Sequence, residues 1–297
     1  MRRHQAIPLA VCGAALLALL SAPNAPAEPK AMTVRVGLVN TLFRDEPVKT
    51  IQSVAGPFKS LLEEQAGIIG EIIAGGDYTK LATQLQEGKI HLGVFNGPEF
   101  AWVHSKYPEL KPLMIAVDRQ PFARVVLVVR ADDKVADAAA LKGKNLALPL
   151  LAREHVRVFV DRRVVGEGMT PDKWFGKVAT PRTSQDALDD VAENFSQAAA
   201  VDQADFDAFK KSFPKTAARL RVLLESEKFP CAAIVYKPGV LTDIVLTKLR
   251  DGMIDAKSTE RGRKLLDLCR ITGFEKVPAE YEQSLTDILK AYPAPKK

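Results

Sequence analysis

The chain has 297 residues, 47% of them apolar, and a formal net charge of +6 at pH 7. That length and apolar share are typical of a globular protein with a large core, which at this size usually divides into two domains. The positive surplus is spread among 36 acidic residues, and no basic tract is longer than Lys210-Lys211 or Lys296-Lys297. This pattern argues against nucleic-acid binding and favours anionic ligands only weakly.

The N-terminus has the pattern of a secretory signal. Basic residues at positions 2 and 3 precede an apolar run from Ile7 to Leu20, and Ala25-Pro26-Ala27 follows the run. Such a run is shorter than the roughly 20 residues that a transmembrane helix needs. We therefore expect residues 1–27 to be a cleaved signal peptide and the mature protein to be soluble in the periplasm.

The cysteines and histidines predict little chemistry. A lipoprotein is not expected, because the bulky Val11 precedes Cys12 and that cysteine lies inside the apolar run. Cys231 and Cys269 remain in the mature chain; an oxidising compartment permits a disulfide, but the spacing does not show that they meet. There is no C-x-x-C, and the histidines have no metal-ligand spacing, so we expect no metal site and no cofactor: His91, His104 and His155 are scattered.

Strand and helix patterns alternate through the first half of the mature chain. The expected elements are a strand at 33–39, a helix at 48–62, a helix between Asp77 and Gly88, a strand at 90–95, a helix at 99–106, and strands at 113–117 and 124–130. Pro57 would kink or restart the first helix. Asp77 is a suitable N-cap for the second, and Asn96-Gly97-Pro98 turns directly into the third.

The second half repeats this order. The expected elements are a strand at 145–148, a helix capped by Thr183-Ser184, a strand at 197–201, a helix around Phe206 and Phe209, and a strand at 220–224. Helical patterns without strands among them follow Gly239, at 240–253, 261–268 and 280–289. The alternation predicts an α/β protein of two similar lobes, one inserted in the sequence of the other.

The predicted lobes share the chain in three pieces. Residues 32–122 and 235–291 form lobe 1, residues 123–234 form the inserted lobe 2, and 292–297 are a tail. The chain would cross between the lobes near 122–126 and near 229–234. Two crossings without a long flexible linker would make a hinge, with a cleft between the lobes.

Candidate binding residues follow from where ligands bind in open α/β sheets. The carboxyl ends of the strands and the adjoining helix N-termini face the cleft in such folds. The residues selected for ligand binding are Asn40, Thr41, Tyr78, Asn96, Arg153, Thr183, Ser184, Gln185 and Asp202.

Each of these residues also has a purely structural explanation. Tyr78 would be an apolar wall of the site or a core residue, and Asn96 would offer its amide to a ligand or only make a turn. Thr183-Ser184 caps a helix in either case, and Asp202 would accept a hydrogen bond from the ligand or cap the next helix. Arg153 would pair with a carboxylate or phosphate, or belong to a solvated helix face. The arginines of that face are Arg157, Arg162 and Arg163.

Several segments resemble, in order, the phosphate/phosphite/phosphonate-type binding proteins of ABC transporters. Gly76-Asp77-Tyr78 and Gly93–Pro98 are similar to the first lobe of that family, Thr170–Phe175 to the second, and Ile271–Phe274 to the return into the first. The resemblance implies the two-lobed type II periplasmic-binding-protein fold. It further implies a small-molecule ligand, an anionic one by the family pattern, and a permease as partner. We expect the protein to be a monomer.

The family pattern is broken where the ligand would be held. A Ser-Thr-Ser-type run that opens a helix is replaced by Pro149–His155, the usual Gly-Ser-His by Thr183-Ser184-Gln185, and a common Asp by His91. Phosphonate specificity therefore does not follow from the resemblance. We expect a larger, less charged or carboxylate-bearing ligand.

Two other classes of function compete with solute binding. An enzyme is not expected, because the chain has no G-x-S-x-G, no metal-spaced histidines and no phosphate-binding glycine loop. The alternative that stays open is an exported ligand sensor or interaction protein that keeps this fold without a transport role.

Overall fold

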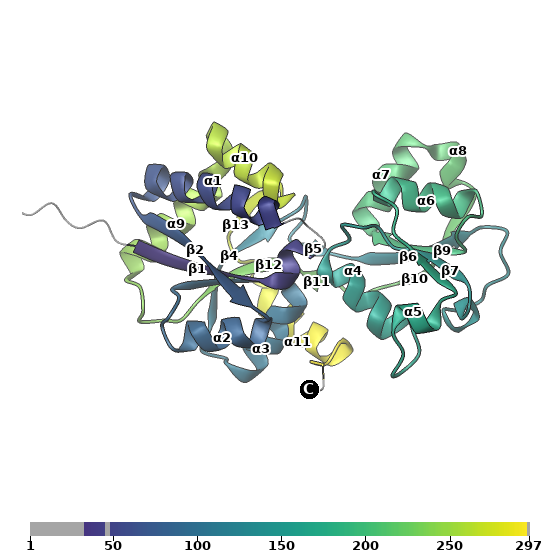
Figure 1. The fold of residues 1–297 in the computed structure, drawn as a ribbon, viewed down its shortest axis with the longest axis horizontal. Coiled ribbons are helices and arrows are strands. Elements are labelled where there is room, and N and C mark those ends of the chain that lie inside the picture. Colours follow the sequence, from purple (N-terminus) through teal and green to yellow (C-terminus); the bar gives the residue numbers. More distant parts are fainter. Residues whose placement is uncertain (1–32, 45–47, 296–297) are drawn as a thin grey trace, which may run out of the picture. The chain divides into compact units, whose positions relative to one another are not determined.

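The computed structural model describes residues 33–44 and 48–295, so the predicted signal at 1–27 lies outside the described residues. In this part of the chain the strands form a six-stranded sheet, a five-stranded sheet and a two-stranded ribbon (Figure 1). The described residues belong to one compact unit. No helix within the described ranges is long and apolar enough to span a membrane.

The first sheet has the strand order β13-β4-β12-β3-β1-β2. Its strands are β1 (Thr33–Val39), β2 (Ile69–Gly76), β3 (Leu92–Phe95), β4 (Lys111–Val117), β12 (Ala232–Tyr236) and β13 (Gly273–Glu275). β1 pairs in parallel with β2 and β3, whereas β12 is antiparallel to β3 and β4. The expectation that no strand follows Gly239 is wrong. β13 pairs with β4, and its single apolar residue, Phe274, is too short a pattern to reveal an edge strand.

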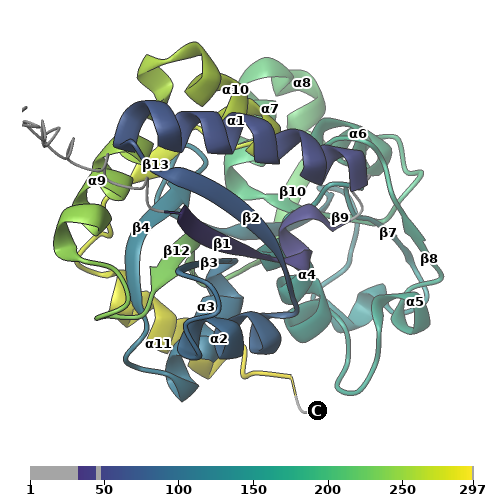
Figure 2. The ribbon, with the colours of Figure 1, turned by 60° about the vertical axis from the view of Figure 1, so that its left-hand side comes forward.

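Helices cover both faces of the first sheet (Figure 2). One face carries α1 (Val48–Ala66), α9 (Asp243–Ile254) and α10 (Glu260–Cys269); the other carries α2 (Tyr78–Gln86), α3 (Gly97–Lys106) and α11 (Tyr281–Ala291). Apolar side chains of β1 point to both faces of the sheet, because successive side chains of a strand alternate between its faces. Val36 packs under the first set of helices and Val39 under the second. Pro57 lies inside α1, which continues through it without a restart.

The second sheet has the strand order β10-β6-β9-β7-β8, which matches β4-β12-β3-β1-β2 of the first sheet in both order and strand direction. Its strands are β6 (Val125–Arg130), β7 (Asn145–Ala147), β8 (Lys177–Ala179), β9 (Ala198–Asp202) and β10 (Leu220–Glu225). Its helices are α4 (Glu154–Phe159), which continues into a π-helical turn at Val160–Val164, α5 (Pro171–Trp174), α6 (Ser184–Ala192), α7 (Gln203–Ser212) and α8 (Pro214–Ala217). Short 3-10 turns lie at Asn40–Phe43, Ala139–Leu141 and Asp255–Ser258.

Two short strands connect the sheets. β5 (Phe122–Ala123) and β11 (Phe229–Pro230) pair antiparallel at the positions where the sequence predicted the two crossings. The backbone of this ribbon lies so close to the start of α3 that one position there must be a glycine. A Cβ on Gly97, at the start of α3, would lie only 1.8 Å from the carbonyl oxygen of Pro230, so the helix can start here only with a glycine.

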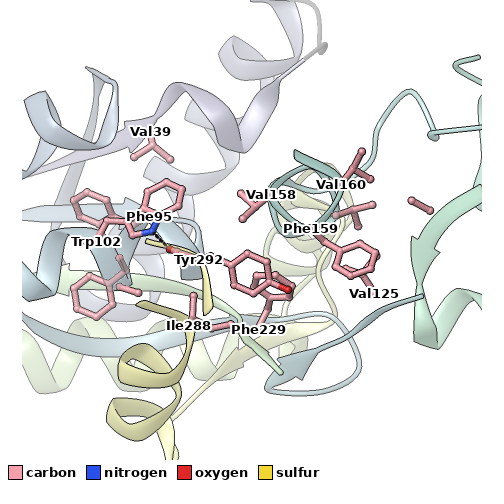
Figure 3. Packing of buried hydrophobic residues seen from close by; sticks show 14 of the residues in the cluster. Val39, Phe95, Trp102, Val125, Val158, Phe159, Val160, Phe229, Ile288 and Tyr292 are labelled. Carbon is pink, nitrogen blue, oxygen red and sulfur yellow. Dashed lines mark hydrogen bonds between the residues drawn. The ribbon is translucent and has the colours of Figure 1, made fainter. Parts of the chain in front are cut away.

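Aromatic side chains pack where α11 meets the ribbon. Tyr292, the first residue of the predicted tail, has a fully buried side chain. Its ring centroid lies 4.8 Å from that of Phe229, and its carbonyl oxygen accepts a 2.7 Å hydrogen bond from Nε1 of Trp102 (Figure 3). The chain therefore remains part of the core as far as Tyr292.

Candidate functional site

A cavity of about 550 Å³ is lined by residues from both large sheets and from the ribbon. Its polar lining comes from the turns after β1, β3 and β4 in the first sheet and from the start of α4 and the end of β9 in the second. This is the edge where the parallel strands of each sheet end, as expected for open α/β sheets.

The turns after β1 and β3 hold a buried carboxyl group. Glu99, in the first turn of α3, is 2% exposed. Thr41 Oγ1 donates to Glu99 Oε1 at 2.7 Å, and Asn96 Nδ2 donates to Thr41 Oγ1 at 2.9 Å and to Glu99 Oε2 at 3.0 Å. Burial raises the pKa of Glu99 to about 7, although the hydrogen bond from Thr41 acts to lower it. The polar groups of Thr41 and Asn96 are therefore already engaged by a group of the protein itself.

The second sheet contributes a histidine–aspartate pair. His155 Nε2, on α4, lies 2.7 Å from Oδ1 of Asp202 at the end of β9. Burial acts to raise the pKa of Asp202, but His155 and two arginines outweigh it and hold the pKa below its usual value. Asp202 is thus a carboxylate with its charge already compensated at neutral pH.

Arg153 occupies the N-cap position of α4 and points to the first sheet. Its Nη2 donates to Oδ2 of Asp118 at 3.0 Å and also to the carbonyl oxygen of Arg270. Arg119 donates from its Nη2 to Asp118 at 3.3 Å and to Oδ1 of Asp205 at 2.7 Å. Two arginines thus share Asp118 at the mouth of the cavity.

A further ion pair joins the two sheets. Arg44, after the turn that follows β1, makes two hydrogen bonds to Glu154 of α4, from Nη2 at 3.0 Å and from Nε at 3.1 Å. Arg270 Nη1 donates to the carbonyl oxygen of Leu151 at 3.0 Å. These contacts tie the start of α4 to the first sheet from both sides.

The structure brings four of the predicted binding residues together. Thr41, Asn96, Arg153 and Asp202 line the cavity. The remaining predicted residues lie outside its lining: Asn40, Tyr78, Thr183, Ser184 and Gln185.

Three of the residues outside the lining have partners of their own. Tyr78 packs against Trp102 with ring centroids 5.3 Å apart. Thr183 caps α6 by accepting from the backbone N–H of Asp186 at 3.0 Å. Ser184 donates to Oδ2 of Asp205 at 2.7 Å, and Asp205 in turn holds Arg119. Ser184 is therefore one residue removed from the lining.

Sequence reasoning missed Glu99, Arg44 and Arg119. Glu99 could have been found, because an Asn followed three residues later by a Glu is a known N-terminal pattern of helices. Arg44 and Arg119 lie in turns without periodicity, and Arg119 has a positive φ of 67° that no local signal predicts.

Both cysteines of the described chain line the cavity and are free. Burial raises the pKa of each thiol to about 11, so both are protonated at neutral pH and weak nucleophiles. The described residues contain no group of three or more His, Cys, Asp or Glu side chains arranged to hold a metal ion.

The cavity carries a positive surplus. Basic side chains outnumber acidic ones in its lining: Arg44, Arg119, Arg124, Arg153, Lys228 and Arg270 against Asp118, Glu154, Asp202 and Asp207. Because most of the arginines are paired, the surplus suits a ligand of low negative charge.

Comparison with known proteins gives a family and a fold. A family model described as "ABC transporter, phosphonate, periplasmic substrate-binding protein" matches residues 41–281. A binding protein component of an ABC phosphonate transporter from Pseudomonas aeruginosa is 16% identical, with a TM-score of 0.54 over 87% of this chain and 86% of that one. PhnD1 from Prochlorococcus marinus, solved with methylphosphonate, is 14% identical, with a TM-score of 0.54 over 87% and 97%. A Xanthomonas citri protein bound to ATP is 15% identical, with a TM-score of 0.55 over 88% and 97%. At such identities the similarity of structure shows the fold alone.

Proposed function

Because the chain belongs to the phosphonate family of periplasmic substrate-binding proteins of ABC transporters, we propose that its cavity captures a small organic anion and that the loaded protein docks on the transporter permease. The family places the protein outside the cytoplasm. The predicted type II periplasmic-binding-protein fold is confirmed by the solved structures that it resembles. The single observation that carries the proposal is a cavity lined from both sheets in which basic groups predominate.

We also propose how the protein is exported and how its lobes move when it binds the ligand. Residues 1–27 would be a cleaved export signal without a lipid anchor, and the mature protein would act as a monomer. Residues 32–122 with 235–291, and residues 123–234, would form lobes that move about the ribbon of β5 and β11. The pairing of these two strands supports that hinge.

Within the cavity we propose that Arg153 anchors the negative group of the ligand. It already bonds to a carboxylate, Asp118, which a ligand of the same chemistry can replace. Thr41 and Asn96 would border the site, Asp202 would orient His155, and Ser184 would position Arg119 through Asp205. Asn40, Tyr78, Thr183 and Gln185 would reach the ligand only if the elements that carry them move on binding.

Thermal-shift screening of the mature protein against small organic anions tests the proposal. A ligand present at 100 times its dissociation constant should stabilise the folded state by about 2.7 kcal/mol. A panel of carboxylates, sulfonates and phosphonates of different size, with organic cations as controls, should give hits only among the anions. Stabilisation by cations alone would contradict anion capture.

Inorganic phosphate and methylphosphonate should bind weakly or not at all. A buried double charge requires several donors, and the donors nearest the start of α3 are occupied by Glu99. The segment that replaces the family's hydroxyl run, Pro149–Ala152, offers no hydroxyl group. Calorimetry with phosphate, methylphosphonate and phosphite measures this, and micromolar binding of any of them would show the prediction to be wrong.

Replacing Arg153 by alanine should weaken an anion found in the screen by about 1.5–3 kcal/mol, the usual value of a hydrogen bond between charged groups. Arg157→Ala is the matched control, since Arg157 lies on the same helix but outside the cavity lining and bonds to the carbonyl oxygen of Leu150. Calorimetry on both variants should show the loss for Arg153 alone. Equal affinities of both variants and wild type would place Arg153 outside the binding site.

A further inference from the structure

The cavity continues beyond its polar mouth into an apolar chamber. The lining of the chamber comes from the first sheet and from α1, α9 and α10. These three helices cover one face of that sheet (Figure 2). Leu38 and Val94 from the sheet line it on one side, and Phe58 of α1 with Leu249 and Met253 of α9 line it on the other. This chamber is thus a part of the same cavity as Arg153 and Asp202.

The described side chains that line the chamber do not fill it. Leu38, Phe58, Ile72 and Val94 lie between a sheet and its covering helices, yet each keeps exposed surface. Protein interiors normally pack closely, with few voids larger than a water molecule. The whole cavity, mouth and chamber together, has a volume of about 550 Å³, which lies in the range of pockets for organic ligands and far exceeds what a single phosphate-sized ion would fill.

The mouth supplies a positive charge for a head group. Lys228 lines the cavity, is exposed, and forms no hydrogen bond or ion pair with any residue of the described chain. Arg119 and Arg153 are paired with two carboxylates, those of Asp118 and Asp205, so their charges are compensated and little positive charge is left for a second negative charge on a ligand. The polar part of the cavity therefore suits one negative charge.

From this arrangement we infer that the ligand is an amphiphilic monoanion. Its charged head, a carboxylate or sulfonate, binds at the mouth beside Arg153 and Lys228, and its unbranched apolar tail enters the chamber. The inference rests on the proposed function, because it takes the same cavity as the ligand site. The inference adds that the ligand has an apolar tail, a feature for which a purely polar cleft would not select.

A chain-length series tests the tail. Calorimetry with acetate, butanoate, hexanoate and octanoate should show the affinity rising about fourfold for each added methylene until the chamber is filled. Octylammonium, with the opposite head charge, should not bind. If butanoate binds as tightly as octanoate, the inference is wrong while anion capture stands. If no member of the series and no other anion of the screen binds, both are wrong.

Two alanines on neighbouring strands test the chamber without relying on a ligand. Ala116 on β4 lines the cavity, whereas Ala233 on β12 faces the other side of the sheet and is fully buried in a packed core. Ala116→Leu should place its larger side chain in empty space, so the melting temperature should be kept or raised. Ala233→Leu should lower it, because extra methyl groups strain a closely packed core.

The same variants separate the chamber from the mouth. Ala116→Leu should reduce the advantage of octanoate over butanoate at least tenfold, because its larger side chain takes up space that the longer tail needs. Ala233→Leu should leave the ratio of the two affinities unchanged. If Ala116→Leu lowers the melting temperature as much as Ala233→Leu and does not change the ratio, the chamber does not receive the tail.

Discussion

Replacing Tyr292 by alanine is expected to lower the free energy of unfolding by about 3–5 kcal/mol, the usual cost of removing a large aromatic side chain from a core. Its ring is fully buried between Phe229 and the guanidinium of Arg163, which lies 5.5 Å from the ring centroid. Its hydroxyl group donates to Oε2 of Glu227. Denaturant unfolding of the mature protein measures the change.

Tyr292→Phe separates the ring from the hydroxyl group. This variant keeps the packing against Phe229 and loses the hydrogen bonds of the hydroxyl group to Glu227 and Arg163, so it should cost about 1.5–3 kcal/mol, less than the alanine variant. Arg163 still pairs with Glu227 in it. If the alanine variant unfolds at the same denaturant concentration as wild type, the segment after α11 is not part of the core.

The stability of the protein should fall between about pH 4.5 and pH 7 through one buried group, Glu99. Burial raises its pKa from 4.5 to about 7, so the folded protein holds this proton more tightly than the unfolded chain does. The stabilisation is complete below about pH 4.5 and is lost as the pH rises through about 7. A shift of this size corresponds to roughly 3 kcal/mol over that range.

Glu99→Gln isolates this contribution. Glutamine keeps the size and can accept the hydrogen bond from the backbone N–H of Asn96, but it does not titrate. The difference in unfolding free energy between the variant and wild type should therefore grow in favour of the variant from pH 4.5 to pH 8. Urea unfolding at several pH values measures it. Parallel pH profiles of the two proteins would mean that Glu99 does not carry a raised pKa.

The same residue bears on ligand choice. An ionised Glu99 places a negative charge beside Thr41 and Asn96, at the helix start where anions bind in many proteins. The protein's own carboxylate therefore takes the place that a phosphate-like group would otherwise occupy. This agrees with a ligand whose head binds at Arg153 and Lys228 instead.

Local features of this protein could be predicted from its sequence. Asp77 and Thr183 were expected to cap helices, and each accepts a hydrogen bond from the backbone N–H three residues later, at 2.8 Å and 3.0 Å. The two crossings were predicted from the helical patterns after Gly239, which were expected to complete the first lobe, and β5 and β11 pair at those positions. These signals depend on neighbours within a few positions, which the order of residues determines directly.

The site needed the tertiary structure. Thr41 meets Glu99, Arg44 meets Glu154 and Arg153 meets Asp118, and in each pair the partners are far apart in the chain. No periodicity encodes such pairs, because the fold alone brings their strand ends together. The apolar chamber is a further case. From the sequence, Leu38 and Val94 are ordinary core residues. Whether a core leaves an empty space depends on how closely the helices pack on the sheet, and the hydrophobic pattern of the sequence does not encode this distance.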